Sequence, residues 1–275
     1  KAAYSKDLIT EANAGLGRAY FSDIDISNNI WENYFSYEKS LEKITINSTL
    51  GYAYQSFDNK QKRSSAARYS TSDLDVMLNN LGDADISVLN NSSNEFNEIQ
   101  SYFGKIFVGF SDKYLLTATL RTDGSTRFGG DNQYGFFPSF AAKWKLIEES
   151  FINKDVFSDL GLRIGYGVTG NQSIPHNLYA ARTRFGDNNI NTDATKVEGG
   201  GANNVTFNNP GLKWESTSAL NIGLDFGFMK NALRGSIEFY DKHTKDLLFL
   251  VSSAQPATTP FTWKNLNTDI QNRGV

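Results

Sequence analysis

The chain of 275 residues contains no cysteine, which excludes disulfide bonds, thiolate metal sites and a cysteine nucleophile. It has only two histidines, His176 and His243, on separate segments, so no metal site is indicated. Its formal net charge of -3 gives no basic surface for nucleic acid. The longest apolar run, Leu247–Val251, falls far short of the roughly 20 residues of a membrane helix.

Glycine and aromatic residues are abundant in the sequence. There are 23 glycines, 13 tyrosines and 20 phenylalanines but only 5 prolines, and Asn, Ser and Thr fill the stretches between apolar segments. This composition is typical of a β-rich protein with long polar loops. A Gly-x-Ser-x-Gly nucleophile elbow and a paired-carboxylate signature are both missing. We therefore predict an all-β protein that is not an enzyme and holds no cofactor.

Several stretches alternate between apolar and polar residues with a period of two. In the clearest, Leu220, Ile222 and Leu224 share one face, and Asn221 and Asp225 lie on the other. Alternation over about ten residues matches the length of a membrane β-strand. The predicted strands of this kind are 44–54, 114–121, 160–169, 220–228 and 233–240.

The connections between these strands alternate in length. Turns near residues 40, 112 and 230 are short, whereas the loops that begin near 56, 123, 170 and 251 are long. The segment 147–158 is intermediate in length and falls on the short side of the alternation. Short turns at one end and long loops at the other are typical of an outer-membrane barrel, although a soluble β-sandwich remains the alternative. We also expect Gln55–Asn97 to be a long charged loop with a brief helix at Asp73–Leu81, Ser252–Asn267 to be another loop, and Lys6–Ala14 to be a short helix.

The hairpin 113–140 has a tip rich in charged residues and turn formers. Arg121, Asp123, Arg127 and Asp131 could contact a ligand at a loop mouth, or they could pair with one another and fix the tip. Both interpretations fit the pattern, and mutual pairing is the simpler one.

The pattern Gly165-x-Gly167-x-x-Gly170 matches the dinucleotide-binding fingerprint only superficially. That fingerprint requires a helix after the last glycine. Pro175 follows five residues later and argues against such a helix. The three glycines are better explained as residues that clear space on the inner face of a barrel.

Aromatic residues cluster near the predicted strand ends. Aromatic girdles at the two membrane interfaces would place them there, and so would ordinary packing at the edge of a core. The pattern leaves both explanations open. The residues are Trp31, Tyr114, Trp144, Phe151, Trp214 and Phe228.

Several motifs, in order and at specific spacing, resemble the SusC/RagA-type TonB-dependent outer-membrane transporters of Bacteroidota. The resemblance runs from about Tyr37 to the C-terminus. Two departures are small: Thr122 separates Arg121 from Asp123, and Gly161 stands where the family usually has lysine. The matching motifs are Leu120–Gly129 with Tyr134–Ser139, Leu160–Gln172, Asn209–Glu215, Gly223–Phe226, Tyr240–Leu248 and Asn272–Val275, the last being the expected start of a new strand.

The resemblance implies a fold for the whole chain. Residues 1–275 would form about nine or ten strands of a large antiparallel transmembrane β-barrel, in the class of roughly 22 strands with a plugged lumen. The long loops would be extracellular and the short turns periplasmic. The plug domain, the TonB box and the terminal strands would lie outside this sequence.

The resemblance also implies a function and a set of partners. A protein of this family imports oligosaccharides, peptides or similar nutrients across the bacterial outer membrane. It works with a SusD-like surface lipoprotein and with the TonB complex, and it contacts outer-membrane lipid. The alternative is a non-transport structural or adhesive β-sandwich. The sequence does not identify the substrate or the ligand-binding residues.

Overall fold

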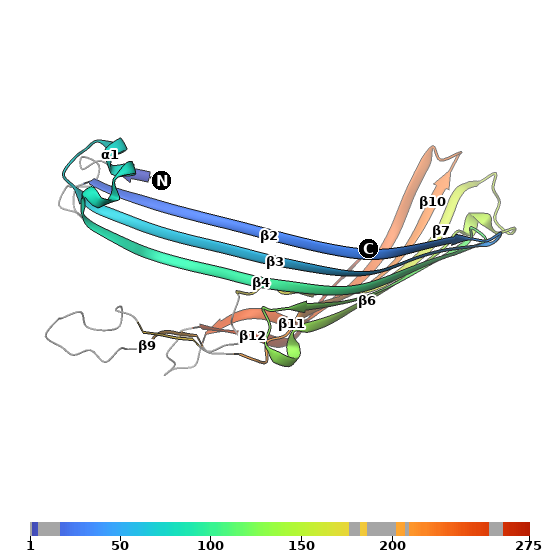
Figure 1. Ribbon diagram of the computed structural model, residues 1–275. Coiled ribbons are helices and arrows are strands. Elements are labelled where there is room, and N and C mark those ends of the chain that lie inside the picture. Colours follow the sequence, from blue (N-terminus) through green and yellow to red (C-terminus); the bar gives the residue numbers. More distant parts are fainter. Residues whose placement is uncertain (1, 5–16, 176–181, 186–201, 207–208, 253–260) are drawn as a thin grey trace. The chain divides into compact units, whose positions relative to one another are not determined.

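Ten strands form one antiparallel sheet in the computed structural model, which describes residues 2–4, 17–175, 182–185, 202–206, 209–252 and 261–275 (Figure 1). Their order is β1-β2-β3-β4-β5-β6-β7-β10-β11-β12, so nearly every strand lies beside its neighbours in sequence. A second sheet pairs β8 with β9. The bounds are β1 Ala2–Tyr4, β2 Gly17–Ser40, β3 Ile44–Tyr69, β4 Ala84–Phe110, β5 Tyr114–Ser125, β6 Tyr134–Trp144, β7 Phe157–Asn171, β8 Arg182–Phe185, β9 Ala202–Thr206, β10 Glu215–Phe228, β11 Leu233–Ser252 and β12 Phe261–Gly274.

The helices are short. The α-helix α1 spans Leu74–Asn79, and the 3-10 helices η2, η3 and η4 span Leu81–Asp83, Gly130–Asn132 and Leu146–Glu148. In the part of the chain that the structure describes, no helix is both long and apolar enough to cross a membrane. The predicted helix at Lys6–Ala14 lies outside the described residues.

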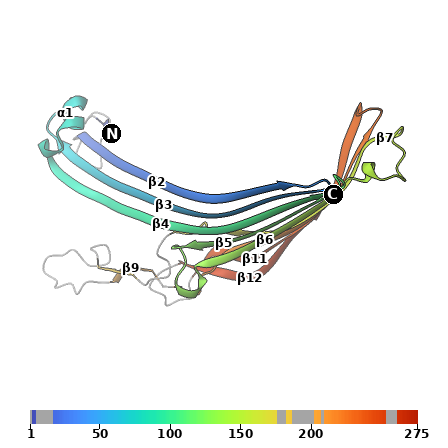
Figure 2. The same ribbon diagram turned by 45° about the vertical axis from the view of Figure 1, so that its right-hand side comes forward.

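The prediction of a long loop at Gln55–Asn97 is wrong over most of its length. The strand β3 continues to Tyr69, and β4 begins at Ala84, so both are long strands that lie side by side (Figure 2). Exposed charged residues such as Lys60 and Lys62 interrupt any apolar period here, so the sequence carries no strand signal. The brief helix expected within this segment is confirmed as α1.

The loop predicted at Ser252–Asn267 is also too long, because β12 already begins at Phe261. The expectation that a strand starts near Asn272 is therefore wrong, since that residue lies near the end of β12. The β11–β12 ladder shifts register between Lys245 and Leu247. This shift and the many polar residues of β12 hide its alternation from a sequence analysis.

The chain divides into two compact units. The first contains residues 1–29 and 55–97, and the second contains 30–54 and 98–275. In the first unit, Tyr69 and Met77 are fully buried, and the Tyr69 hydroxyl donates to the Met77 carbonyl at 3.0 Å. The Asp73 carboxylate caps α1 by accepting from the backbone N–H of Asp75 at 2.9 Å. A small apolar core thus holds α1 against the strands of this unit.

In the second unit, two tight turns connect successive strands as the sequence predicts. Ser111 and Asp112 have φ values of 51° and 55°, and Lys113 N–H donates to the Phe110 carbonyl at 3.0 Å. Lys230 and Asn231 also have positive φ. Two consecutive residues with positive φ define the type I′ turn that suits the twist of a hairpin.

The sheet of the second unit has one apolar and one polar face. On β10, Leu224 is directly opposite Leu162 of β7 and Ile237 of β11, and these three side chains are exposed. Asp225 and Gly223 alternate with them on the other face. Exposed apolar side chains on a regular sheet face predict that this face meets lipid or another apolar partner.

Candidate functional site

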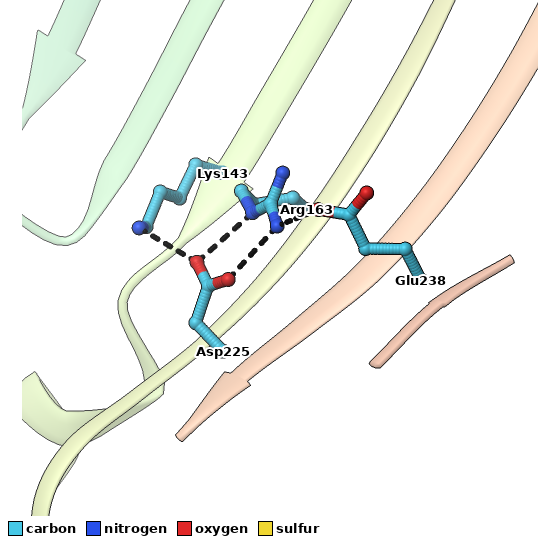
Figure 3. Close-up of polar contacts among 4 residues, drawn as sticks. All are labelled: Lys143, Arg163, Asp225 and Glu238. Atoms are coloured by element: carbon cyan, nitrogen blue, oxygen red, sulfur yellow. Dashed lines mark hydrogen bonds and ion pairs between the residues drawn. The ribbon is translucent and has the colours of Figure 1, made fainter. Parts of the chain in front are cut away.

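Four charged residues form a cluster on the polar face of the sheet, which we call the wall cluster (Figure 3). Asp225 accepts from Arg163 Nε and Nη2, each at 2.9 Å, and from Lys143 Nζ at 3.0 Å. The Nη2 atom of Arg163 also reaches a Glu238 oxygen at 2.5 Å. The cluster balances two cations against two carboxylates and joins β6, β7, β10 and β11.

Strand register places these side chains beside one another. Lys143 is opposite Arg163, Arg163 is opposite Gly223, and Gly223 is opposite Glu238. A Cβ added at Gly223 would lie 3.0 Å from Arg163 Nη2 and 3.5 Å from Glu238 Cγ. The missing side chain therefore leaves room for the Arg163 guanidinium to cross β10 and reach Glu238.

The sequence alone does not identify the wall cluster as a unit. Each member is a single charged residue on the polar side of an alternating strand, and the partners are up to 82 residues apart in the chain. The available signal is the charge of opposite sign on successive predicted strands. Only the register between strands converts that signal into contacts.

A second feature is a compact apolar cluster where the long connections meet the strands, which we call the rim core. Phe128 and Leu212 are fully buried, and Ile174 and Leu248 are nearly so. The ring centroid of Trp214 lies 5.2 Å from that of Phe128. The Trp214 ring also packs edge-on against the ring of Phe137, at 5.3 Å between centroids. The complete rim core consists of Phe128, Ile174, Leu212 and Leu248, with Trp214 and Trp263 packed against it.

Hydrogen bonds reinforce the rim core. The Trp214 indole N–H donates to the Gln133 carbonyl at 2.9 Å, and Asn209 Nδ2 donates to the Trp263 carbonyl at 2.9 Å. Asn265 Nδ2 donates to the Lys213 carbonyl at 2.8 Å. These bonds connect segments that are distant in sequence, so the rim core joins several connections into one unit.

The charged residues of the 113–140 hairpin are only partly paired as expected. Arg121 Nε donates to both oxygens of Asp123 at 2.8 Å, which confirms mutual pairing for these two. Arg127 instead donates through Nη1 to the Ile174 carbonyl. Asp131 lies in the 3-10 helix η3. Arg127 therefore ties its hairpin to the rim core, because Ile174 belongs to that core and comes from a different connection.

The glycine-rich stretch lies within β7, so it does not form the loop and helix of a dinucleotide site. A Cβ at Gly165 would meet only the Phe140 carbonyl at 3.9 Å, which is consistent with open space. A Cβ at Gly170 would overlap the Phe137 ring and lie 2.9 Å from Trp214. Gly170 thus permits an aromatic ring to pack directly on the backbone beside the rim core.

The opposite end of the sheet carries an anchor centred on Glu149. This carboxylate accepts from Trp144 Nε1 at 3.0 Å, Lys113 Nζ at 3.0 Å and the Tyr114 hydroxyl at 3.1 Å. The Trp144 indole N–H and the Lys113 ammonium hold the pKa of Glu149 below its ordinary value, against the opposing effect of desolvation. The Tyr114 ring also stacks between Trp144 and Phe110.

The aromatic residues at strand ends divide between the two explanations. Tyr114 and Trp144 form a stacked row, as an interface girdle would. Trp214 belongs to the rim core, as ordinary packing would have it. Trp31 contacts Tyr52 edge-on at 5.7 Å, and Phe151 is exposed.

His243 makes contacts that its sequence neighbourhood does not reveal. Its Nδ1 lies 3.0 Å from Asp269 across the β11–β12 ladder, and its Nε2 lies 3.4 Å from Asp241. Among the described residues, no group of three or more potential ligands is arranged to hold a metal ion. His176 lies outside the described residues.

All 275 residues match the family model described as "TonB dependent receptor-like, beta-barrel". The chain therefore belongs to this family of outer-membrane β-barrels. It is 32% identical over 270 residues to TonB-dependent receptor P3 of Formosa agariphila, covering 96% of this chain and 25% of that protein. It is 41% identical over 163 residues to TonB-dependent receptor SusC of Bacteroides thetaiotaomicron, covering 55% and 15%.

Solved structures share the fold. A structure of the RagAB peptide transporter matches with a TM-score of 0.84 and 22% identity, covering 99% of this chain and 29% of that one. The same importer in an "open-open" state matches at 0.70. The chain thus spans about a quarter, or less, of the length of the curated relatives that it matches most fully.

Family and fold together confirm several predictions. The chain is part of an antiparallel outer-membrane β-barrel, its relatives in the family are TonB-dependent receptors and not enzymes, and its long connections are extracellular. The apolar face of the sheet is therefore the lipid face, and the face with the wall cluster lines the lumen. The rim core lies at the extracellular ends of the strands, and the Glu149 anchor lies at the periplasmic ends.

Proposed function

We propose that this chain forms part of the barrel wall of a transporter that imports nutrients across the outer membrane with TonB-derived energy. The substrates would be oligosaccharides, peptides or similar molecules. The main support is the family match over the whole chain. The named relatives include SusC and a peptide transporter, which indicates import in general and leaves the substrate class open.

The two-faced wall suits this role. The lumen face carries Lys143, Arg163, Asp225 and Glu238 as a neutral, mutually paired set. Such a set stiffens four adjacent strands without leaving an unpaired charge that would trap a passing substrate of opposite sign. We infer that the wall cluster maintains the shape of the barrel, and that ligand selection falls to other parts of the transporter.

The extracellular rim suits a partner that covers the barrel mouth. We propose that a SusD-like surface lipoprotein docks at this end and that the TonB complex acts through parts outside residues 1–275. The rim core supports the first proposal because it packs Phe128, Ile174 and Trp214 together and so fixes these points at the barrel mouth. A preformed surface binds with less loss of conformational freedom than a set of independent loops.

The alternative, a structural or adhesive β-sandwich, requires two sheets packed face to face. In the part of the chain that the structure describes, ten strands instead lie in one sheet. Exposed leucine and isoleucine side chains lie on one face of this sheet, with no second sheet of described residues packed against them. The fold therefore favours a membrane wall over a sandwich.

Uptake by intact cells tests the proposal. The source bacterium would be compared with a strain lacking the full-length gene, using labelled oligosaccharide and peptide pools. We expect the deletion strain to lose uptake of one pool, and an uncoupler to abolish that uptake in the parent. Uptake of a porin-sized monosaccharide serves as the control and should be unchanged. Equal uptake of every pool by the two strains would contradict an import function.

A pull-down tests the proposed partner separately. Full-length transporter with an affinity tag would be purified in mild detergent, and the bound proteins would be identified by mass spectrometry. We expect a surface lipoprotein in stoichiometric amount. Its absence from the pull-down, while intact cells of the same strain still import nutrient, would contradict the docking of a lipoprotein and leave the import function intact.

A further inference from the structure

The lipid face of the wall contains a groove that the import function does not use. The groove has a volume of about 430 Å³ and extends from Ile106 on β4 to Leu220 on β10. Every residue that borders it belongs to the second unit of the chain. We propose that this groove binds one acyl chain of a phospholipid from the periplasmic leaflet of the outer membrane.

The groove exists because small residues alternate with large ones across neighbouring strands. Ala118 on β5 and Ala142 on β6 form its floor. Ala118 is opposite Phe140, and Ala142 is opposite both Leu116 and Ile164. Each alanine thus has bulky neighbours on the same face, and the step in side-chain size creates a hollow in a regular sheet.

The side chains at the border of the groove stand out from the sheet. Leu116, Phe140, Ile164 and Tyr166 are 43% to 52% exposed. Apolar side chains so exposed in the membrane-facing wall of a barrel contact hydrocarbon. The floor between them offers additional apolar contact to any chain that is thin enough to enter.

The dimensions of the groove favour an acyl chain over a protein segment. One turn of α-helix, about 10 Å across and 5.4 Å long, would already fill the whole volume. The groove crosses five strands from β4 to β10, which at about 4.8 Å per spacing is roughly 19 Å. A long, thin and flexible apolar chain fits this shape, whereas a helix of a second copy or of another protein does not.

The position of the groove indicates which leaflet supplies the lipid. Leu116 and Ala142 each lie two residues from the stacked rings of Tyr114 and Trp144, at the periplasmic end. Both rings direct polar atoms to Glu149, outside the apolar band. Tyrosine and tryptophan of this kind mark the level of lipid headgroups. An acyl chain that enters beside this row therefore belongs to a periplasmic-leaflet phospholipid.

The proposal depends on the placement of the barrel in the outer membrane and not on the substrate imported. Full-length transporter would be extracted in mild detergent and analysed by native mass spectrometry, with Ala118→Phe to fill the groove. The matched control is Ile237→Phe, because Ile237 is also exposed on the lipid face but lies outside the groove.

We expect the wild type and Ile237→Phe to retain one phospholipid, and Ala118→Phe to retain it at least tenfold less. The ring at position 118 would occupy the floor of the groove, so a bound acyl chain would lose its packing contacts there. Equal retention by Ala118→Phe and the wild type would overturn the proposal, as would equal loss in both variants. The transporter could instead have the mass of two copies as wild type and of one copy as Ala118→Phe. That result would overturn the proposal and identify the groove as a contact between two barrels.

A second measurement needs no variant. A phospholipid with a photoactivatable acyl chain would be reconstituted with the wild-type transporter, and the adducts would be mapped by peptide mass spectrometry. We expect adducts concentrated on residues 114–120, 138–144 and 162–166. Adducts spread evenly over all lipid-facing strands would show only bulk lipid and would refute a specific site.

Discussion

Arg163 and Asp225 form a two-point ion pair across the ladder between β7 and β10, although 62 residues separate them in the chain. Both nitrogen–oxygen distances are 2.9 Å. This geometry uses the planar guanidinium fully and fixes the direction of both side chains. Asp225 also accepts from Lys143, so it is the centre of the wall cluster. Substitution of this single carboxylate therefore affects three strands.

The facing of β10 can be tested with adjacent residues. We expect Leu224→Arg, on the lipid face, to cost about 2–4 kcal/mol of folding free energy if it lies near mid-bilayer. Asp225→Asn, on the lumen face, should cost about 1–2 kcal/mol, because it weakens charge-assisted bonds that remain partly solvated. Folding yield of the full-length barrel into lipid vesicles measures both. A larger loss for Asp225→Asn would reverse the assignment of the two faces.

Two glycines of β7 should respond differently to the same substitution. We expect Gly170→Ala to destabilise the barrel by about 1–3 kcal/mol, since the new methyl group would overlap the Phe137 ring. Gly165→Ala has open space and should be nearly neutral. Thermal unfolding of both variants in detergent provides the comparison. Equal shifts in melting temperature would indicate a general strand effect and not ring packing.

The rim core should be essential to the extracellular connections. We expect Phe128→Ala to cost about 3–5 kcal/mol locally, because Phe128 is fully buried and its removal leaves a cavity. Limited proteolysis of intact cells should then cut the connection 126–133 faster than in the wild type. Phe151→Ala is the control, since Phe151 is 68% exposed and lies in the periplasmic connection. Unchanged cleavage in Phe128→Ala would show that the rim does not depend on this core.

The periplasmic anchor should weaken in acid. The folded-state pKa of Glu149 is lowered, chiefly by the Trp144 indole N–H and then by Lys113. Its contribution to stability is therefore complete above the ordinary carboxyl pKa and is lost as pH falls through the lower folded value. We expect the fluorescence of Trp144 to change in the wild type as pH falls below the ordinary carboxyl pKa of about 4.3. Glu149→Gln should remove this acid transition, and an identical transition in that variant would assign it to another group.

The alternating faces of the membrane strands could be predicted from sequence because lipid demands an unbroken apolar face. Leu220, Ile222 and Leu224 meet that demand at every second position. The tight turn at Ser111–Asp112 could also be predicted, because two short polar residues separate the apolar stretch that ends at Phe110 from the alternating strand that starts near Tyr114.

The extensions of β3 and β4 could not be predicted for the opposite reason. These strands have 26 and 27 residues, whereas about 9–11 residues suffice to cross the hydrocarbon. Beyond the membrane no face must be apolar, so residues such as Lys60 interrupt the period without interrupting the strand. The backbone ladder continues where the hydrophobic pattern does not.

The contacts of the wall cluster and the rim core could not be predicted either. The local pattern predicts that Arg127 pairs within its own hairpin, yet its partner is the Ile174 carbonyl, 47 residues away. Such contacts depend on which connections meet in space, and the sequence around Arg127 carries no information about Ile174. The groove likewise depends on register, which sets Ala118 opposite Phe140.

The rim core has a consequence for engineering and for the divergence of relatives. Phe128, Leu212 and Leu248 come from three different parts of the chain but share one interior. An exchange of one connection between two related barrels would place its apolar residue in a pocket shaped for another. Chimeras should therefore fold when the segments that contribute to the rim core are transplanted as a set.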